Sequence, residues 1–117
     1  MSAPRIGPDK LTAAEQTITM SVRGLASVGL QLVMSALAAG VPAWSGTVSF
    51  EATIDGINWV ALNMVPSNSA SAASSATASG IWTANVGGFD IVRARVSAYT
   101  AGWVEAWMEG SEGAGRF

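Results

Sequence analysis

The carboxylates are the most obvious candidates for acid–base chemistry in this sequence. The 117 residues include no histidine and no cysteine, which removes the commonest general base and every histidine-activated nucleophile. Glu51 and Glu105 could be considered as the two acids of a glycoside hydrolase. Both lie in alternating segments at positions expected to face solvent, where a charged side chain is ordinary. We therefore predict that the protein is not an enzyme and has no catalytic residues.

Metal, cofactor and nucleic-acid sites are not expected either. Asp55 and Asn58 are close in sequence, but calcium takes about six to eight oxygen ligands and usually several carboxylates, so Asp55 is better explained as a turn residue. Gly87 and Gly88 do not fit a phosphate-binding loop, because no helix is expected after them. The six basic residues are scattered along the chain, whereas a nucleic-acid surface requires a basic patch.

Trp59 lies three residues after the turn signal Asp55-Gly56. One interpretation is that its indole forms a flat platform on which a sugar or a base stacks. The other is structural, with the indole covering one end of the core. No cluster of Asn, Asp and Arg surrounds Trp59 to bind sugar hydroxyls, which favours the structural role.

Trp103 and Trp107 share one face of a predicted strand with Glu105 and Glu109, while the opposite face is aliphatic. Aromatic side chains are enriched where proteins meet proteins. The two tryptophans are therefore candidates for a partner surface, and a place in the core is the open alternative.

Arg93 and Arg95 alternate in the same way on the preceding predicted strand. Opposite charges on one face of neighbouring antiparallel strands attract each other modestly. We expect the two arginines to lie across from Glu105 and Glu109, in preference to forming an anion site.

Two-residue alternation of apolar and polar side chains runs through most of the sequence and predicts β-strands. The clearest case is residues 47–54, which are followed at once by Asp55-Gly56. This dipeptide favours the positive φ of a two-residue hairpin turn, so we expect residues 57–65 to form an antiparallel neighbour. Similar patterns occur in residues 17–23, 27–38, 80–86, 89–99 and 102–110. About seven strands predict an all-β fold, an antiparallel two-sheet β-sandwich of the jelly-roll or immunoglobulin-like type.

The ends of the chain lack this alternation. We predict an extended N-terminal arm in residues 1–16, the β-sandwich domain in residues 17–111 and a flexible C-terminal tail in residues 112–117. Residues 67–80 consist of small side chains of low complexity, which cannot bury enough surface to offset the entropy of ordering. We expect them to be flexible.

Charged residues make up only 12% of the chain, against roughly a quarter in typical domains, which suggests contacts with other subunits. Residues 24–50 contain no charge, but glycines and prolines interrupt them, and a spanning helix needs about 20 predominantly apolar residues. No membrane association is therefore expected. The N-terminus carries prolines and charges where a secretory signal needs an apolar segment, so synthesis in a cytoplasm is expected.

Four short motifs in residues 44–111 resemble those of small β-sandwich structural proteins of tailed-bacteriophage virions. They are Ile54-Asp55-Gly56 with Trp59, Gly80 with Trp82 and Val86, Val92-Arg93 with Arg95-Val96, and Thr100 with Gly102 and Val104. Their combination is more specific than any one of them, because D-G-x-x-W turns also occur in discoidin-like and carbohydrate-binding jelly rolls. The resemblance implies a non-catalytic virion component, either a capsid decoration (cement) protein or a piece of the tail or baseplate.

The first functional hypothesis is a capsid decoration subunit that forms a homo-oligomer and clamps the major capsid protein or other virion proteins. The partner-binding candidates are Ile6, Leu11, Trp103 and Trp107, whereas Asp55, Gly56 and Trp59 are assigned to the turn and the core. The second hypothesis is a tail, baseplate or fibre module that binds host-surface carbohydrate through Trp59, Trp82 or Trp103. Either one places the protein in the virion, after synthesis in the bacterial cytoplasm.

Overall fold

The computed structural model describes residues 5–112, in which all regular structure is β-strand. The strands are β1 (Arg5–Leu11), β2 (Thr17–Ser21), β3 (Ser27–Met34), β4 (Ser45–Thr53), β5 (Val60–Ala61), β6 (Val65–Pro66), β7 (Ser75–Ala76), β8 (Gly80–Asn85), β9 (Ile91–Ala101) and β10 (Val104–Ser111).

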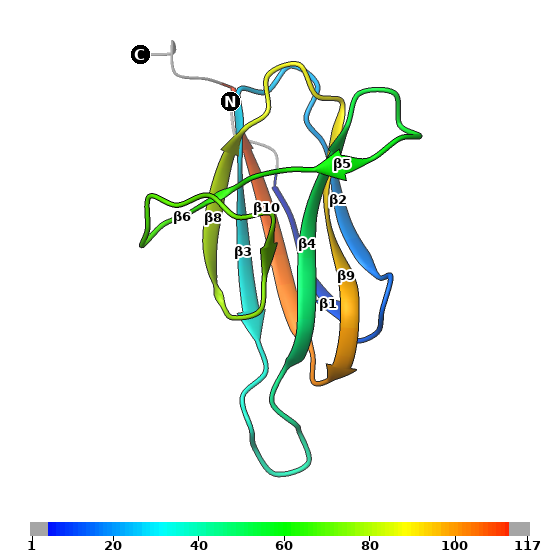
Figure 1. The fold of residues 1–117 in the computed structure, drawn as a ribbon, viewed down its shortest axis with the longest axis vertical. Coiled ribbons are helices and arrows are strands. Elements are labelled where there is room, and N and C mark those ends of the chain that lie inside the picture. The colour runs from blue at the N-terminus through cyan, green and yellow to red at the C-terminus, as the bar shows by residue number, and fades with distance from the viewer. Residues whose placement is uncertain (1–4, 113–117) are drawn as a thin grey trace.

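These strands form two antiparallel sheets that pack face to face (Figure 1). Sheet A has the order β1-β10-β3-β8-β6, and sheet B has the order β2-β9-β4-β5, with β7 also paired to β4. The predicted all-β, two-sheet antiparallel sandwich is confirmed.

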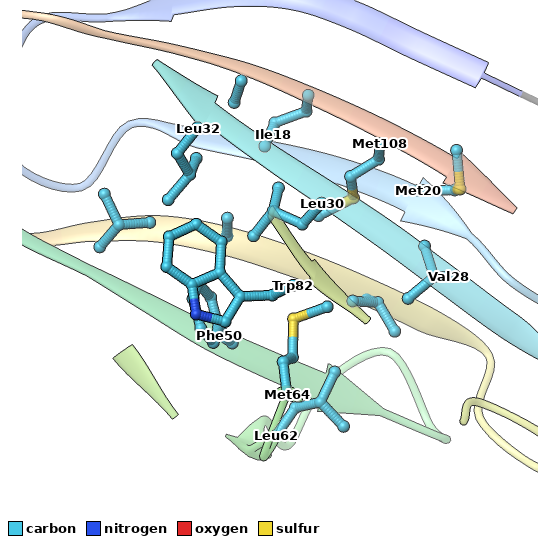
Figure 2. Packing of buried hydrophobic residues seen from close by; sticks show 14 of the residues in the cluster. Ile18, Met20, Val28, Leu30, Leu32, Phe50, Leu62, Met64, Trp82 and Met108 are labelled. Carbon is cyan, nitrogen blue, oxygen red and sulfur yellow. The ribbon is translucent and has the colours of Figure 1, made fainter. Parts of the chain in front are cut away.

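The core lies between the two sheets and is made by the alternation in the sequence. In the central part of β4 and the first half of β9, every second residue is fully buried: Val48, Phe50, Ala52, Val92, Ala94 and Val96. Sheet A contributes the facing side chains, among them Leu30, Met108 and Trp82, whose ring lies 5.5 Å from that of Phe50 (Figure 2). Burial of one large apolar side chain contributes about 1.5–3 kcal/mol, so this layer holds the two sheets together.

Each of the predicted strand segments contains a strand, but the segment after Asp55-Gly56 is divided. β4 and β5 are antiparallel neighbours, as expected from the turn signal, with Ala52 opposite Val60. The connection is longer than a two-residue hairpin turn, since β4 ends at Thr53 and β5 begins at Val60. The chain then leaves sheet B and adds β6 to the edge of sheet A, next to β8.

The low-complexity segment 67–80 is held to the sandwich, and the expectation that it is flexible is wrong. It includes β7, which pairs with β4, and it buries the side chain of Ala76. The Ser79 hydroxyl accepts a hydrogen bond of 2.8 Å from the backbone N–H of Met34. Small side chains suit this place because the segment lies flat against two other elements and contributes backbone hydrogen bonds.

Residues 5–11 of the predicted N-terminal arm form an edge strand of sheet A, β1. β1 pairs along β10, with Leu11 opposite Val104 and Arg5 opposite Glu109, and the side chain of Leu11 is buried in the core. The alternation was hidden because the register shifts between Ile6 and Asp9. Gly7 lies in this irregularity with φ +109°, and a Cβ there would be 2.5 Å from the carbonyl oxygen of Ala106. Residues 1–4 and 113–117, which include most of the predicted tail, lie outside the described residues.

The docking of β1 predicts that Leu11→Ala destabilises the whole domain. Truncation of a buried leucine costs about 2–5 kcal/mol in unfolding free energy, which urea denaturation measures. The matched control is Thr12→Ala, since the neighbouring Thr12 side chain is exposed and the change should stay within about 0.5 kcal/mol of wild type. A free arm would instead give two variants of equal, wild-type stability.

Candidate interaction surface

A groove crosses the outer face of sheet A. It has a volume of about 760 Å³ and is lined by side chains of β1, β10, β3 and β8, including Arg5, Trp107, Gln31, Ile81 and Thr83. Trp107, Gln31 and Ile81 form one row across the sheet, because Trp107 is paired with Gln31 and Gln31 with Ile81. This row offers an aromatic, an amide and an aliphatic side chain side by side.

The groove is hollow because of Gly29 on β3, which lies between Glu109 and Thr83 in the next row. A Cβ at Gly29 would meet its nearest neighbours, two backbone carbonyl oxygens, at 3.9 and 4.0 Å, which is ordinary contact. A side chain therefore fits at Gly29 without strain, and it would fill the groove floor.

The two tryptophans predicted to bind partners have different surroundings. Trp107 is half-buried and lies beside the β1 irregularity, where a Cβ on Gly7 would come within 3.3 Å of its ring. The Lys10 ammonium covers the ring of half-buried Trp103, at 4.8 Å from the centroid. The alternative of a core position is excluded for both, since Val104, Ala106 and Met108 occupy the inner face of β10. Trp107 is the tryptophan that lines the groove.

Two other predicted partner-binding residues are part of the fold itself. Leu11 is buried in the core, and Ile6 is half-buried and packs against it. Both prefer the interior because β1 is a strand and not an arm. Leu11 is therefore not available as an apolar anchor for another protein while β1 remains in sheet A, whereas Ile6 stays partly exposed.

The outer face of sheet B carries an ion-pair cluster centred on Glu51. Its carboxylate accepts hydrogen bonds from Arg93 at 2.7 Å and from Arg95 at 2.8 Å, and Arg95 also reaches Glu15 at 2.9 Å. The hydrogen bonds from Arg95 and then Arg93 lower the pKa of Glu51 below its usual value, although partial burial opposes them. The cluster bridges β4, β9 and the turn before β2.

The expected pairing of Arg93 and Arg95 with Glu105 and Glu109 is wrong. The chain crosses from sheet B to sheet A between β9 and β10, so these arginines and glutamates lie on opposite outer faces of the sandwich. Glu109 instead pairs with Arg5 at 3.2 Å. The same crossing separates Glu51 from Glu105 and rules out a catalytic dyad between them.

Trp59 is half-buried and lies outside the core. Its ring stacks on the guanidinium of Arg93, whose Cζ is 3.9 Å from the ring centroid. The prediction that Trp59 covers an end of the core is therefore wrong, although the residue does have a structural contact. Cation–π stacking of this kind contributes roughly 0.5–2 kcal/mol. No pattern in the sequence predicts this contact, since Trp59 follows an irregular loop.

Asp55 orders the turn, as predicted. Its carboxylate accepts hydrogen bonds from the backbone N–H groups of Asn58 and Ile57, from the Asn58 amide and from the Thr53 hydroxyl. These hydrogen bonds, the one from the Asn58 backbone first, hold the pKa of Asp55 well below its usual range. Gly56 supplies a φ of +79°. Within residues 5–112, no three acidic side chains gather into a group that could hold a metal ion.

An apolar hairpin projects beyond the sheets between β3 and β4 (Figure 1). Residues 36–43, called here the finger, have the sequence ALAAGVPA without any charged or polar side chain. Leu37 near its tip is 81% exposed, the largest exposed fraction among the large hydrophobic residues of the described range 5–112. The pattern in residues 27–38 predicts a strand as far as residue 38, whereas β3 ends at Met34, and the projecting turn was not predicted.

Hydrogen bonds fix the finger at both ends. At the tip, Ala38 and Val41 exchange two backbone hydrogen bonds of 2.9 Å. At the base, the buried Ser35 hydroxyl donates to the Pro42 carbonyl at 2.9 Å and accepts from the Trp103 N–H at 3.0 Å. The apolar surface is therefore presented in a preorganised shape, which reduces the entropy lost on binding.

No protein-family model and no curated protein matches the sequence. Two solved structures resemble the fold. The SPBc2 prophage-derived protein YomS is 14% identical with a TM-score of 0.67, over 95% of this chain and 96% of that chain. The PBSX exported protein XepA is 15% identical with a TM-score of 0.70, over 94% of this chain and 38% of that chain. At these identities the likeness shows a shared fold. In addition, none of the structure in residues 5–112 is a helix that could cross a membrane.

The Glu51 cluster predicts a pH-dependent contribution to stability. Because the pKa of Glu51 is lowered in the folded state, its stabilisation is present above the unfolded-state pKa of about 4.3 and is lost as the pH falls through the folded-state value. At pH 7, Glu51→Gln should lower the unfolding free energy by about 2 kcal/mol, and this difference should shrink in acid.

Urea denaturation of both proteins between neutral and acidic pH measures that difference. Glu109→Gln is the control, because its ion pair with Arg5 is more than half exposed and should change stability by less than about 1 kcal/mol. A Glu51→Gln difference that stays constant down to strong acid contradicts the assigned cause of the pKa shift.

Proposed function

We propose that this protein is a non-catalytic structural component of a bacteriophage virion, and that it decorates the capsid shell. It attaches by burying apolar surface against the major capsid protein or a neighbouring virion protein. The shared fold with the prophage-derived protein YomS supports the phage association, as do the sequence motifs of residues 44–111.

The finger is the observation that carries this proposal. A protein surface rarely exposes a continuous apolar patch without a binding role. None of residues 36–43 is charged or polar, and all of them except the half-buried Val41 are exposed. Because Leu37 is 81% exposed, its burial against a partner would contribute about 1.5–3 kcal/mol to the binding free energy. Since the finger is fixed by the Ser35 hydrogen bonds, most of this free energy is available for attachment.

The opposite end of the molecule is less suited to attachment, although it also exposes aliphatic side chains. Ile54 and Ile57 are exposed in the loop that follows β4, and Val60 is exposed at the start of β5. The same loop holds Asp55, whose carboxylate is kept ionised by its hydrogen bonds. Burying an ion against a partner costs several kcal/mol, so this end is expected to remain in solvent.

Attachment to the particle should therefore depend on Leu37. Leu37→Asp should weaken binding to capsids that lack the protein by about tenfold or more, because it replaces buried apolar surface with a charge. Co-sedimentation of the purified protein with such capsids measures this. Ile57→Asp is the matched control, since Ile57 is 79% exposed at the other end of β4, and it should bind as wild type. Equal binding by Leu37→Asp and wild type contradicts the proposal.

The groove supports a second candidate function, a tail or fibre module that binds host-surface carbohydrate. Sugars pack on aromatic rings and take hydrogen bonds from planar polar groups, and the groove places Trp107 beside Gln31, Arg5, Glu109 and Thr83. Its volume is within the range of ligand sites. Of the tryptophans first considered for this role, Trp82 is buried in the core, and Trp59 and Trp103 each have a cation over one face of the ring.

A glycan array with the purified protein separates the two functions. If the groove binds sugar, Trp107→Ala and Gly29→Val should each abolish binding, the first by removing the stacking surface and the second by filling the floor. Gly29→Val should keep the wild-type melting temperature to within a few degrees, because the site has room for a Cβ. Absence of any saturable glycan binding eliminates this second function.

A further inference from the structure

One edge of sheet B is open along the whole of β2. β2 pairs with β9 on one side, and among residues 5–112 no strand pairs with its other side. It lies along one flank of the sandwich (Figure 1). An open edge presents backbone groups to which another strand can add.

The backbone hydrogen bonds identify which groups are free. Val96 donates to the carbonyl of Gln16, and Val22 donates to the carbonyl of Asp90. In the antiparallel register of β2 and β9, hydrogen-bonded pairs alternate with non-bonded ones, so Ile18 and Met20 bond to β9. The N–H and C=O groups of Thr17, Thr19 and Ser21 therefore point away from the sheet.

The other edges of the sandwich are protected against strand addition. β1 carries Pro8, a register shift and three charged residues. β6 has only two residues, one of them Pro66, and β5 and β7 have two residues each. By contrast, β2 has the sequence TITMS, with no proline, no charge and no irregularity in its pairing. Proline, charge, bulges and short length protect an edge strand against edge-to-edge pairing, and β2 lacks all of the first three.

We propose that two copies of this chain pair through β2, antiparallel about a two-fold axis at Thr19, and so join their B sheets into one. The outward-pointing groups fit this axis. Thr19 lies opposite Thr19 of the second copy, and Thr17 lies opposite Ser21, each at a hydrogen-bonded position. A two-fold interface requires such self-complementarity. Small hydroxyl side chains on the outer face also form favourable cross-strand pairs.

The charges that flank β2 complete this complementarity. The same axis places Glu15, two residues before the strand, opposite Arg23 of the second copy, two residues after it. Both side chains are exposed, at 69% and 77%. Within one chain Glu15 contacts Arg95 and Arg23 contacts Asp90, so each extends an existing ion pair across the interface. A second copy is thus favoured over an unrelated strand.

Sedimentation equilibrium of the purified protein over a concentration series tests this pairing, which does not depend on the proposed virion function. Wild type should show a rise from monomer to dimer mass. Thr19→Lys should stay monomeric over the same series, because the two lysines would meet at a Cα separation of about 5.5 Å. Thr83→Lys makes the same change at an exposed residue of β8, between β3 and β6, and should dimerise as wild type.

A charge exchange tests the register. Glu15→Lys and Arg23→Glu should each weaken dimerisation by roughly three- to tenfold, and the double variant should restore the wild-type dissociation constant. The single changes also alter contacts with Arg95 and Asp90, so melting temperatures are compared to establish that each variant is folded.

The possible results separate cleanly. A wild-type dimer that is lost in Thr19→Lys and restored in the double charge variant supports the pairing. A wild type that is monomeric at every concentration overturns it. So does a dimer that Thr19→Lys leaves unchanged, or a double charge variant no better than its parents.

Discussion

The burial of alternate side chains between the two sheets is the constraint from which the rest of the structure follows. Because side chains in a strand alternate strictly, a shift of one residue in any pairing would move the core side chains to the solvent face. Val48, Phe50, Val92, Ala94 and Val96 are all fully buried, so the register of β4 against β9 has no competitor. The same alternation places Glu51, Arg93 and Arg95 on the outer face of sheet B.

Three surfaces of the molecule lie outside the core that these alternating side chains build. The outer face of sheet A becomes a groove because Gly29 takes an outward position among larger residues. On the outer face of sheet B, Arg93 and Arg95 both form ion pairs with Glu51, so these charges are neutralised within the molecule. The apolar side chains of the finger are exposed because the finger extends beyond the end of β3 and the start of β4, where no facing sheet covers it.

The alternation in the sequence was enough to predict the class of fold and most of the strands. Successive side chains of a strand point to opposite faces, so a strand with one buried face shows a two-residue period. The prediction failed where the structure depends on pairing between distant segments that the local pattern does not show. β1 was missed because Gly7 and a register shift interrupt its period, and β7 because two residues are too few to show one. The predicted ionic partners of Arg93 were wrong because β9 and β10, although consecutive in sequence, belong to different sheets. No signal distinguished the finger from an ordinary loop, because its exposure depends on the whole sandwich.

Residue-resolved amide hydrogen exchange of β2 tests this account most directly, because it reads the register from the backbone. In dilute solution the amides of Ile18 and Met20, which point to β9, should exchange slowly, and those of Thr17, Thr19 and Ser21 should exchange fast. Slow exchange at the three outward amides and fast exchange at Ile18 and Met20 would mean that the strand is shifted by one residue. That result would contradict the register of β2 against β9, and with it the burial of Ile18 and Met20 in the core and the open edge of sheet B.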